Sequence, residues 1–398
     1  MIFNTWVFAL FGIAVLIVYW TLIPQRLKPY YIIVTGCIFY AYAVPAYLLL
    51  IVVLGLITFT IARLMMVPGR SLRGRKALLT LGVVLIAGVL VYFKYTKLFA
   101  LTINEVASRD ILPLPSIVVP LAISFFTFEF VHVLVDVYYG KIRELDALEF
   151  AVFTMFFPTL VAGPIKRFQS FAPQVRSVEP LPTSEALLNV YRIAIGLAKK
   201  YIIADSMTLL TQPILTPGAT YTTPDYWVGM LAYTAKIYFD FTGYSDIAIG
   251  LAGLLGFRIP ENFDRPYWAE NISQFWRRWH MSLSSWIRDY IFIPLGGSRR
   301  GKVLTALNLF VAMALAGLSH GAAWTFVLWG LWHGIGLAAH RAWSVTAVPR
   351  LAVLNSGTAQ VRALSIIATF LFVCFGWVLF AASSAVNAAA IYAHLLGR

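Results

Sequence analysis

Long apolar runs separated by short polar or basic segments occupy most of the chain. The first run covers 6–23, and an uncharged stretch follows at 29–62. A membrane-spanning helix needs about 20 apolar residues, so the first run predicts one span. The second stretch is too long for one span and contains Pro45, so it predicts a helical hairpin that is broken at the proline.

The same pattern continues to the end of the chain. The segment 151–165 is apolar but short and is interrupted by proline and glycine, which favours a re-entrant element. The segment 274–290 mixes aromatic and basic residues and predicts an interfacial helix. Further helical stretches are expected at 77–93, 120–139, 186–215, 226–257, 304–340 (two passes with a break at 317–321), 363–381 and 387–396. The pattern therefore predicts an all-α polytopic membrane protein, with about ten transmembrane helices in a single domain over 1–398.

Composition agrees with a membrane protein. Of the 398 residues, 60% are apolar and 12% are charged, whereas soluble domains are about 45–50% apolar and about 25% charged. So few charges cannot cover the surface of a soluble enzyme, a nucleic-acid-binding domain or a disordered regulator. The formal net charge of +14 comes from basic residues in short loops, so the expected partner is membrane lipid and not nucleic acid.

The basic loops also predict an orientation. The turn at 26–28 and the loop at 70–76 flank the first hairpin, and the positive-inside rule assigns both to the cytoplasm. The N-terminus is then expected on the outer side of the membrane, and the first run indicates a retained span because it has no basic n-region or cleavage site. Cys37 and Cys374 both lie in apolar runs, so neither a disulfide framework nor a metal site is predicted.

Ionisable residues inside the apolar runs predict a polar interior. A charge at the bilayer centre costs about 2.5–3.5 kcal/mol, so such side chains usually face a cavity or a partner. Lys236 and Asp240 are four residues apart on one predicted helix, and a structural ion pair between them is the alternative interpretation. The number of these groups favours a tunnel lined by Glu129, Lys236, Asp240 and Asp246, with Asp136 as a further intramembrane acid.

The segment 274–290 is the densest in functional side chains. On a continuous helix, Trp276, His280 and Ser284 would stack at four-residue spacing. One interpretation is a helix anchored at the membrane surface by tryptophan and arginine. The other is a binding site for a cytosolic donor molecule that carries phosphates. Trp276 and the arginines would form it, because guanidinium groups bind phosphates through paired hydrogen bonds. The candidate phosphate-binding residues are Arg277, Arg278 and Arg288.

His320 is the candidate general base. Gly317 and Gly321 flank it and interrupt the apolar stretch, which lets a ligand approach. An imidazole with a pKa of about 6.5 suits the removal of a hydroxyl proton at neutral pH. A hydrogen-bonded core histidine is the alternative interpretation. His333 and His340 are interpreted as structural, and His333 would lie about 20 Å from His320 along a continuous helix.

Taken together, these segments resemble the membrane-bound O-acyltransferase family, in particular its alginate-type bacterial branch. The most specific match is 274–301, QFWRRWHMSLSSWIRDYIFIPLGGSRRG. Where family members commonly have tryptophan before the intramembrane histidine, this chain has Ser319. The other matching segments are 120–140, 156–168, 238–250, 257–267, 318–334 and 375–380.

The resemblance implies that His320 is the essential histidine and His280 is the second recurring polar residue. It also implies a tunnel fold and transfer of an acetyl group from a cytosolic thioester to an exported polysaccharide of the alginate or cellulose type. The thioester, acetyl-CoA or an acyl carrier, would be a substrate, and no tightly bound cofactor is expected. An extracytoplasmic acetyltransferase and polysaccharide synthesis machinery are the expected partners.

Three alternatives stay open. Within the same chemistry, the chain would transfer another acyl group, such as D-alanine from a carrier protein, to a cell-envelope polymer. A transporter is disfavoured because no inverted repeat is visible and 274–290 has no role in transport. A non-catalytic scaffold is disfavoured because both His280 and His320 are present.

Overall fold

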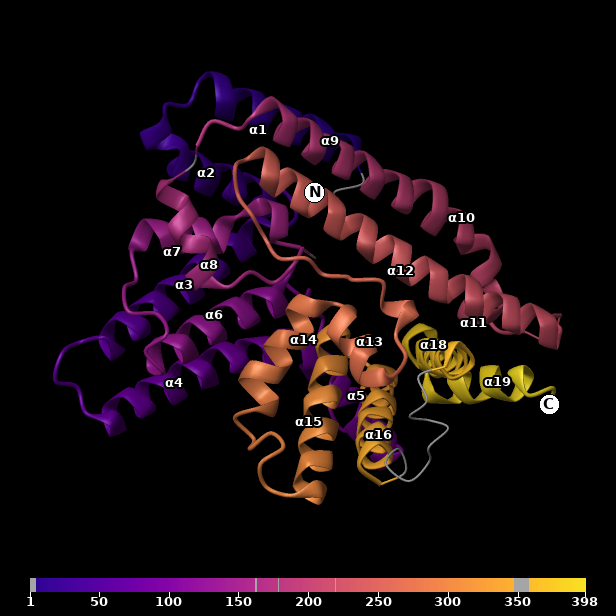
Figure 1. The fold of residues 1–398 in the computed structure, drawn as a ribbon. Coiled ribbons are helices and arrows are strands. Elements are labelled where there is room, and N and C mark those ends of the chain that lie inside the picture. The colour runs from indigo at the N-terminus through magenta and orange to yellow at the C-terminus, as the bar shows by residue number, and fades with distance from the viewer. Residues whose placement is uncertain (1–4, 162, 178, 219, 347–357) are drawn as a thin grey trace. The chain divides into compact units, whose positions relative to one another are not determined.

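The computed structural model describes residues 5–161, 163–177, 179–218, 220–346 and 358–398, and regular structure within these ranges is helical (Figure 1). The chain folds into two compact units. Unit 1 comprises Met1–Leu197 and Tyr244–Pro260, and unit 2 comprises Ala198–Gly243 and Glu261–Arg398. The single-domain organisation remains a prediction.

Unit 1 contains the hairpin predicted at 29–62 and the short apolar segment predicted at 151–165. Pro45 is the first residue of its helix, where its missing N–H is tolerated, so the break falls where the sequence predicts it. The helix at 147–155 has 9 residues and is too short to span a bilayer. The helices are α1 (Trp6–Thr21), α2 (Lys28–Ala41), α3 (Pro45–Met65), α4 (Leu72–Leu90), α5 (Thr96–Ala107), α6 (Ile123–Tyr138), α7 (Ala147–Met155), α8 (Phe168–Phe171) and α9 (Thr183–Ala198).

One expected helix end in unit 1 is wrong. The sequence predicts a span over 77–93, but α4 continues through a π-helical turn (Val91–Tyr95) into α5, so the helix extends to Ala107. Lys94 does not end the helix because its ammonium donates a hydrogen bond to Ser124 Oγ at 3.0 Å. A charge with a partner is compatible with a continuing helix.

The core of unit 1 is aromatic and closely packed. Helices α3, α4 and α6 lie side by side (Figure 1), and Phe126, Phe130 and Phe150 are buried between neighbouring helices. A Cβ on Gly36 of α2 would lie 1.8 Å from the carbonyl oxygen of Met155 at the end of α7. Only glycine permits this approach, which seats the short helix α7 against the core.

Unit 2 contains the paired passes and the segment with the candidate site. Helix α15 ends at His320, Gly321 is extended, and α16 begins at Trp324, which confirms the predicted break. The two helices then pack against each other (Figure 1). Its helices are α10 (Asp205–Met207), α11 (Gln212–Leu215), α12 (Thr223–Leu254, whose last turns belong to unit 1), α13 (Ile272–Arg278), α14 (Met281–Ile287), α15 (Lys302–His320), α16 (Trp324–Thr346), α18 (Ala359–Ala381) and α19 (Ala385–Leu395).

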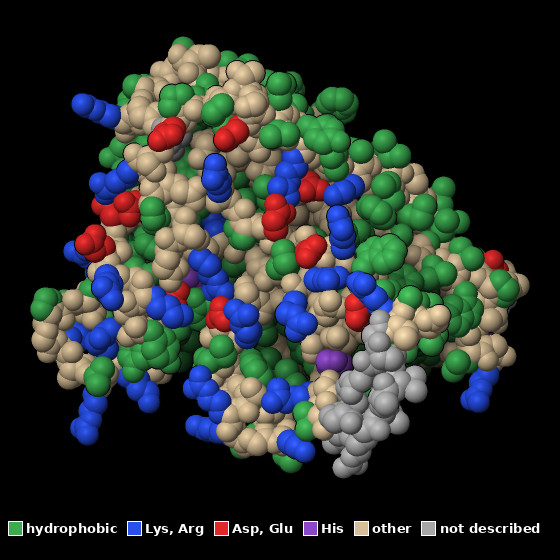
Figure 2. Space-filling view, in the orientation of Figure 1, with side chains coloured by type: hydrophobic (Ala, Val, Ile, Leu, Met, Phe, Trp, Pro, Cys, Tyr) green, Lys and Arg blue, Asp and Glu red, His purple; other side chains and the backbone are tan. Residues whose placement is uncertain are grey.

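Four helical segments of the described chain are long and apolar enough to cross a membrane: Pro45–Met65, Leu72–Ala107, Lys302–His320 and Ala359–Ala381. Helices α1 and α19 are apolar but shorter. Apolar side chains lie open on much of the face in Figure 2, as expected for surfaces in contact with lipid. The fold is that of a helical membrane protein, and the larger number of spans remains a prediction.

Candidate functional site

The chain leaves the helical conformation at His280. Helix α13 ends at Arg278, Trp279 is extended, and His280 has a left-handed backbone with φ 43° before α14 begins. The expectation that Trp276, His280 and Ser284 stack on one helix is therefore wrong.

The cause of this break is a hydrogen-bonded segment upstream. The N–H of Met281 donates to the carbonyl of Asn262 at 2.9 Å, and the N–H of Asp264 donates to the carbonyl of Arg278 at 3.0 Å. These bonds replace helical ones and hold His280 in a backbone conformation that non-glycine residues rarely adopt. The ring of His280 is thereby turned into the protein, where it is 3% exposed.

The two predicted catalytic histidines lie together. The ring centroids of His280 and His320 are 6.4 Å apart. His280 lies between the short helices α13 and α14, and burial together with the neighbouring His320 holds its pKa well below the usual value. The charged form of His280 is therefore disfavoured, and the ring can accept a hydrogen bond.

Aromatic rings enclose this pair. Phe241 of α12 packs edge-on against His280 with ring centroids 4.7 Å apart. The His320 ring lies 5.3 Å from both the Trp329 and Phe380 rings. These rings shield His280, which is buried, whereas His320 remains partly exposed.

His333 lies nearer to His320 than a straight helix would allow. The chain reverses after Gly321, and Trp329 contacts both His320 and His333, whose ring centroid is 5.0 Å from the indole. His333 is completely buried, and Trp276 Nε1 donates to its Nδ1 at 3.3 Å. This hydrogen bond is what a structural histidine would make, although the role of His333 remains a prediction.

A cavity of about 990 Å³ in unit 2 collects several of the predicted donor-binding residues. Trp276, Arg277 and Arg288 line it, together with Arg341, which the sequence did not single out. Arg288 also pairs with Asp289 at 2.8 Å, and none of the described lining residues is acidic. The cavity therefore favours an anionic ligand.

Two residues that line the cavity are close in the sequence to the histidine pair. They are Met281, the residue after His280, and Ala316, one helical turn before His320. The rings of His280 and His320 are not themselves part of the cavity lining.

Arg278 is separated from the other predicted donor-binding residues. It lines a different pocket of about 760 Å³ together with Arg265 and Arg362, and its Nη1 donates to the carbonyl of Trp268 at 3.4 Å. Neighbouring positions on a helix point about 100° apart, so Arg277 and Arg278 serve different surfaces.

Lys236 and Asp240 do not form the ion pair that was the alternative interpretation of their spacing. Asp240 instead contacts Lys200 at 2.8 Å, and Lys200 also contacts Asp205 at 2.8 Å. The side chain of Asp240 is 47% exposed, so this acid is a partnered group on α12 and not a buried one.

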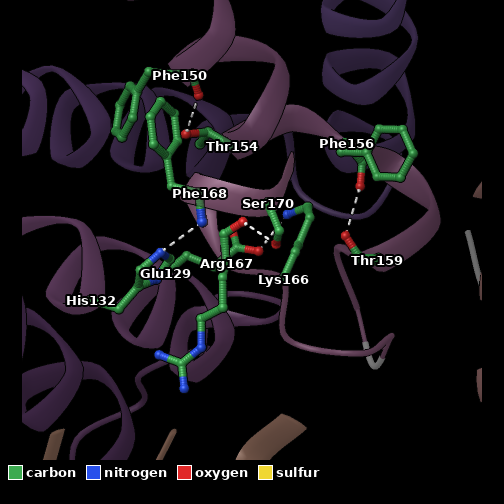
Figure 3. A network of polar contacts seen from close by, with 10 residues as sticks. All are labelled: Glu129, His132, Phe150, Thr154, Phe156, Thr159, Lys166, Arg167, Phe168 and Ser170. Atoms are coloured by element: carbon green, nitrogen blue, oxygen red, sulfur yellow. Dashed lines mark hydrogen bonds and ion pairs between the residues drawn. The ribbon is translucent and has the colours of Figure 1, made fainter. Parts of the chain in front are cut away.

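The other two predicted tunnel residues belong to unit 1. Asp246 pairs with Arg192 of α9 at 3.0 Å. Glu129 on α6 is buried and forms an ion pair with Lys166 (Figure 3). The structure therefore gives each predicted acid a local partner and does not bring the four tunnel residues together within one unit.

The polar cluster around Glu129 contains residues that the sequence did not reveal. Lys166 is 1% exposed, and its ammonium lies 4.4 Å from the centre of the Phe153 ring. His132 is completely buried, and its Nε2 accepts a hydrogen bond from the N–H of Phe168 at 3.1 Å (Figure 3). The only sequence signal for this cluster is the spacing of Glu129 and His132 on one face of α6.

The arrangement in unit 2 suits proton transfer beside a bound anion. Two imidazoles lie in an aromatic enclosure, and arginines line the adjoining cavity. Among the described residues, no three His, Cys, Asp or Glu side chains group as metal ligands, and the expected absence of a metal remains a prediction.

Comparison with known proteins gives consistent similarities. Residues 46–384 match the model of MBOAT, the membrane-bound O-acyltransferase family. The chain is 39% identical to the probable alginate O-acetylase AlgI of Pseudomonas aeruginosa, over 96% of this chain and 72% of that protein. It is 33% identical to the peptidoglycan O-acetyltransferase of Helicobacter pylori, over 80% of this chain and 64% of that protein. It is 34% identical to the teichoic acid D-alanyltransferase of Streptococcus thermophilus, over 56% and 57% of the two chains.

Proposed function

The chain belongs to the membrane-bound O-acyltransferase family and is an O-acyltransferase, and from this premise we propose that it moves acetyl groups from a cytosolic thioester across the membrane. The acetyl groups modify an exported polysaccharide of the alginate or cellulose type. The names of the alginate O-acetylase and peptidoglycan O-acetyltransferase relatives support an envelope glycan as the acceptor.

The observation that carries this proposal is the His280–His320 pair beside the arginine-lined cavity. His320 acts as the general base. It takes the proton of an acceptor hydroxyl while the oxygen attacks the thioester carbonyl, and it returns the proton to the departing thiolate. His280 orients or polarises the reacting groups. General base catalysis typically contributes about 10²–10⁴-fold, which is adequate for a reactive thioester held in position.

The donor binds in the cavity with its phosphates near Arg277, Arg288 and Arg341. Guanidinium groups bind phosphates in paired, charge-assisted hydrogen bonds. Trp276 supplies an apolar wall for the remainder of the donor. Acetyl-CoA or an acetylated carrier protein is the donor, and it is consumed as a substrate.

The proposed membrane arrangement follows the basic loops. The loops 70–76 and 296–302 lie in the cytoplasm, the N-terminus lies outside, and about ten spans enclose a polar tunnel. Single cysteines placed in the two loops should resist an impermeant thiol reagent in intact cells. Ready labelling of either loop from outside would reverse the orientation. An extracytoplasmic acetyltransferase and the polysaccharide synthesis machinery would complete the modification.

A second candidate is transfer of D-alanine from a carrier protein to a cell-envelope polymer. The teichoic acid D-alanyltransferase relatives favour it, but the alginate O-acetylase relatives align over a larger share of this chain. The same cavity and histidine pair would serve either acyl group.

The test uses the purified full chain in lipid nanodiscs with radiolabelled acetyl-CoA, acetylated carrier protein and D-alanyl carrier protein. Acetyl transfer to an oligosaccharide acceptor or to water is expected with an acetyl donor, and His320→Ala should abolish it. His394→Ala is the matched control, because His394 stacks on Tyr226 and does not line the cavity. Transfer of D-alanine alone would establish the second candidate, and full activity of His320→Ala would overturn the mechanism.

A further inference from the structure

Asn262 holds the turn at His280 with both its main chain and its side chain. Its carbonyl oxygen accepts the N–H of Met281 at 2.9 Å. Its side-chain oxygen Oδ1 lies 2.6 Å from Ser282 Oγ and 3.2 Å from His280 Nδ1. Asn262 is completely buried, and its main chain and side chain together contact the three successive residues 280–282.

The geometry identifies which amide atom faces the histidine. A separation of 2.6 Å is typical of an O–H···O hydrogen bond and shorter than most bonds that an amide N–H makes. The atom nearest Ser282 is therefore the oxygen, and a carbonyl oxygen accepts two hydrogen bonds. Because Oδ1 can only accept, the hydrogen of a neutral His280 must be on Nδ1.

We propose that Asn262 is a positioning residue that holds His280 in the Nδ1–H form, so that Nε2 is the ring's acceptor. The importance of this for catalysis rests on the proposed function. An unprotonated Nε2 cannot donate a hydrogen bond to the oxyanion that develops on the thioester carbonyl. It can accept one from His320, whose other ring nitrogen then faces the hydroxyl proton. His280 therefore orients His320, and the oxyanion is stabilised by other donors.

The protonation state can be measured without reference to activity. The chain has six histidines, so ¹⁵N-histidine labelling gives few signals, and the His280 signals are those that disappear in His280→Gln. Nδ1 should show the shift of a protonated ring nitrogen and Nε2 that of an unprotonated one. In Asn262→Leu, this preference should be lost. A wild-type protein with its hydrogen on Nε2 would overturn the proposal.

Kinetics give a second and independent test. Asn262→Asp keeps the acceptor atoms and adds a negative charge, which raises the pKa of His280. Since His280 must be neutral to accept a hydrogen bond, the acid limb of the kcat–pH profile should move to higher pH. Asn262→Leu should lower kcat about tenfold or more while donor KM stays unchanged, the size of effect seen when a histidine loses its orienting partner.

The surroundings of His280 make this profile interpretable. Among the described residues, the titratable group that acts on His280 is His320, and its other contacts Phe241, Asn262 and Ser282 do not titrate. Asn308→Leu is the matched control, because Asn308 is also buried in unit 2 and its Nδ2 donates to the carbonyl of Gly297 at 3.0 Å. The control should lower thermal stability without moving the pH profile.

The outcomes separate this proposal from the proposed function. If the Asn262→Asp profile superimposes on that of the wild type while His280→Ala is inactive, the positioning role is wrong and the function stands. If His280→Ala and His320→Ala are both fully active but the Nδ1–H form is observed, the proposed catalytic mechanism is wrong and the Asn262 contact stands.

Discussion

Removing one partner of the buried Lys166–Glu129 ion pair should destabilise the protein more than removing both. Their side chains are 1% and 8% exposed. Breaking a buried pair typically costs about 3–5 kcal/mol because the remaining charge has no partner, whereas replacing both charges with apolar groups is about neutral. We therefore expect Lys166→Met to be severe and the double variant with Glu129→Leu to recover much of the loss.

The two single variants should also differ from each other. Lys166→Met keeps the aliphatic chain and leaves a bare carboxylate in the core. Glu129→Leu leaves the ammonium of Lys166, which lies 4.4 Å and 5.6 Å from the ring centres of Phe153 and Phe171. Cation–π attraction in a desolvated site contributes about 2 kcal/mol, so Glu129→Leu should be the milder change by roughly that amount.

Thermal unfolding of the purified variants in detergent measures these differences. The two cysteines, Cys37 and Cys374, are partly and fully buried, so a thiol-reactive dye reports unfolding. The double-mutant cycle should give a coupling free energy of at least about 2 kcal/mol, within the range for contacting residues. Arg176→Met is the matched control, because Arg176 pairs with Glu149 at 2.7 Å on the surface and should change stability little. If the two single losses in stability are additive, with a coupling below about 0.5 kcal/mol, Lys166 and Glu129 do not stabilise each other as an ion pair.

Two further predictions use neighbouring or matched positions. Arg277→Ala should raise the KM for acetyl-CoA more than it lowers kcat, whereas Arg278→Ala should leave KM near wild type because it lines another pocket; equal increases in KM would contradict this division. A Cβ on Gly317 would lie 2.0 Å from the carbonyl oxygen of Phe326, while among the described residues nothing lies within 4 Å of a Cβ on Gly88. Gly317→Ala should therefore lower the unfolding temperature in detergent and Gly88→Ala should not, and equal unfolding temperatures would contradict the close packing of α15 and α16.

The helices and their breaks could be predicted from the sequence because local chemistry determines them. Apolar run length defines a helix that can span a bilayer. Pro45 and Gly321 mark helix boundaries through their own backbone restrictions. The apolar segment 151–165 is short in the sequence, and the structure ends the short helix α7 within it, at Met155.

The break at His280 could not be predicted because its cause lies eighteen residues upstream. The backbone and side chain of Asn262 draw residues 280–282 out of the helix, and no local pattern records this contact. The partner of a charged residue in an ion pair could not be predicted for the same reason. Lys236 is the neighbour of Asp240 along the helix, but the packing of a separate segment brings Lys200 to it.

The sequence could predict in part that Arg277 and Arg278 line different pockets. Consecutive residues on a helix point in different directions, so Arg277 and Arg278 could not both line one surface. Arg341 could not be found in this way, because it joins the cavity only after the chain reverses between α15 and α16. The two histidines could be identified from the sequence, whereas tertiary packing determines which arginines line the cavity.

The proposed mechanism assigns the general-base role to His320. The most direct measurement is the ester content of the exported glycan in cells that express wild type, His320→Ala or His333→Ala at matched levels in the membrane. His320→Ala should abolish acetylation with thermal stability near wild type, because its ring is only partly buried. His333→Ala should retain substantial activity or lose it together with stability. Full ester content with His320→Ala would contradict the account.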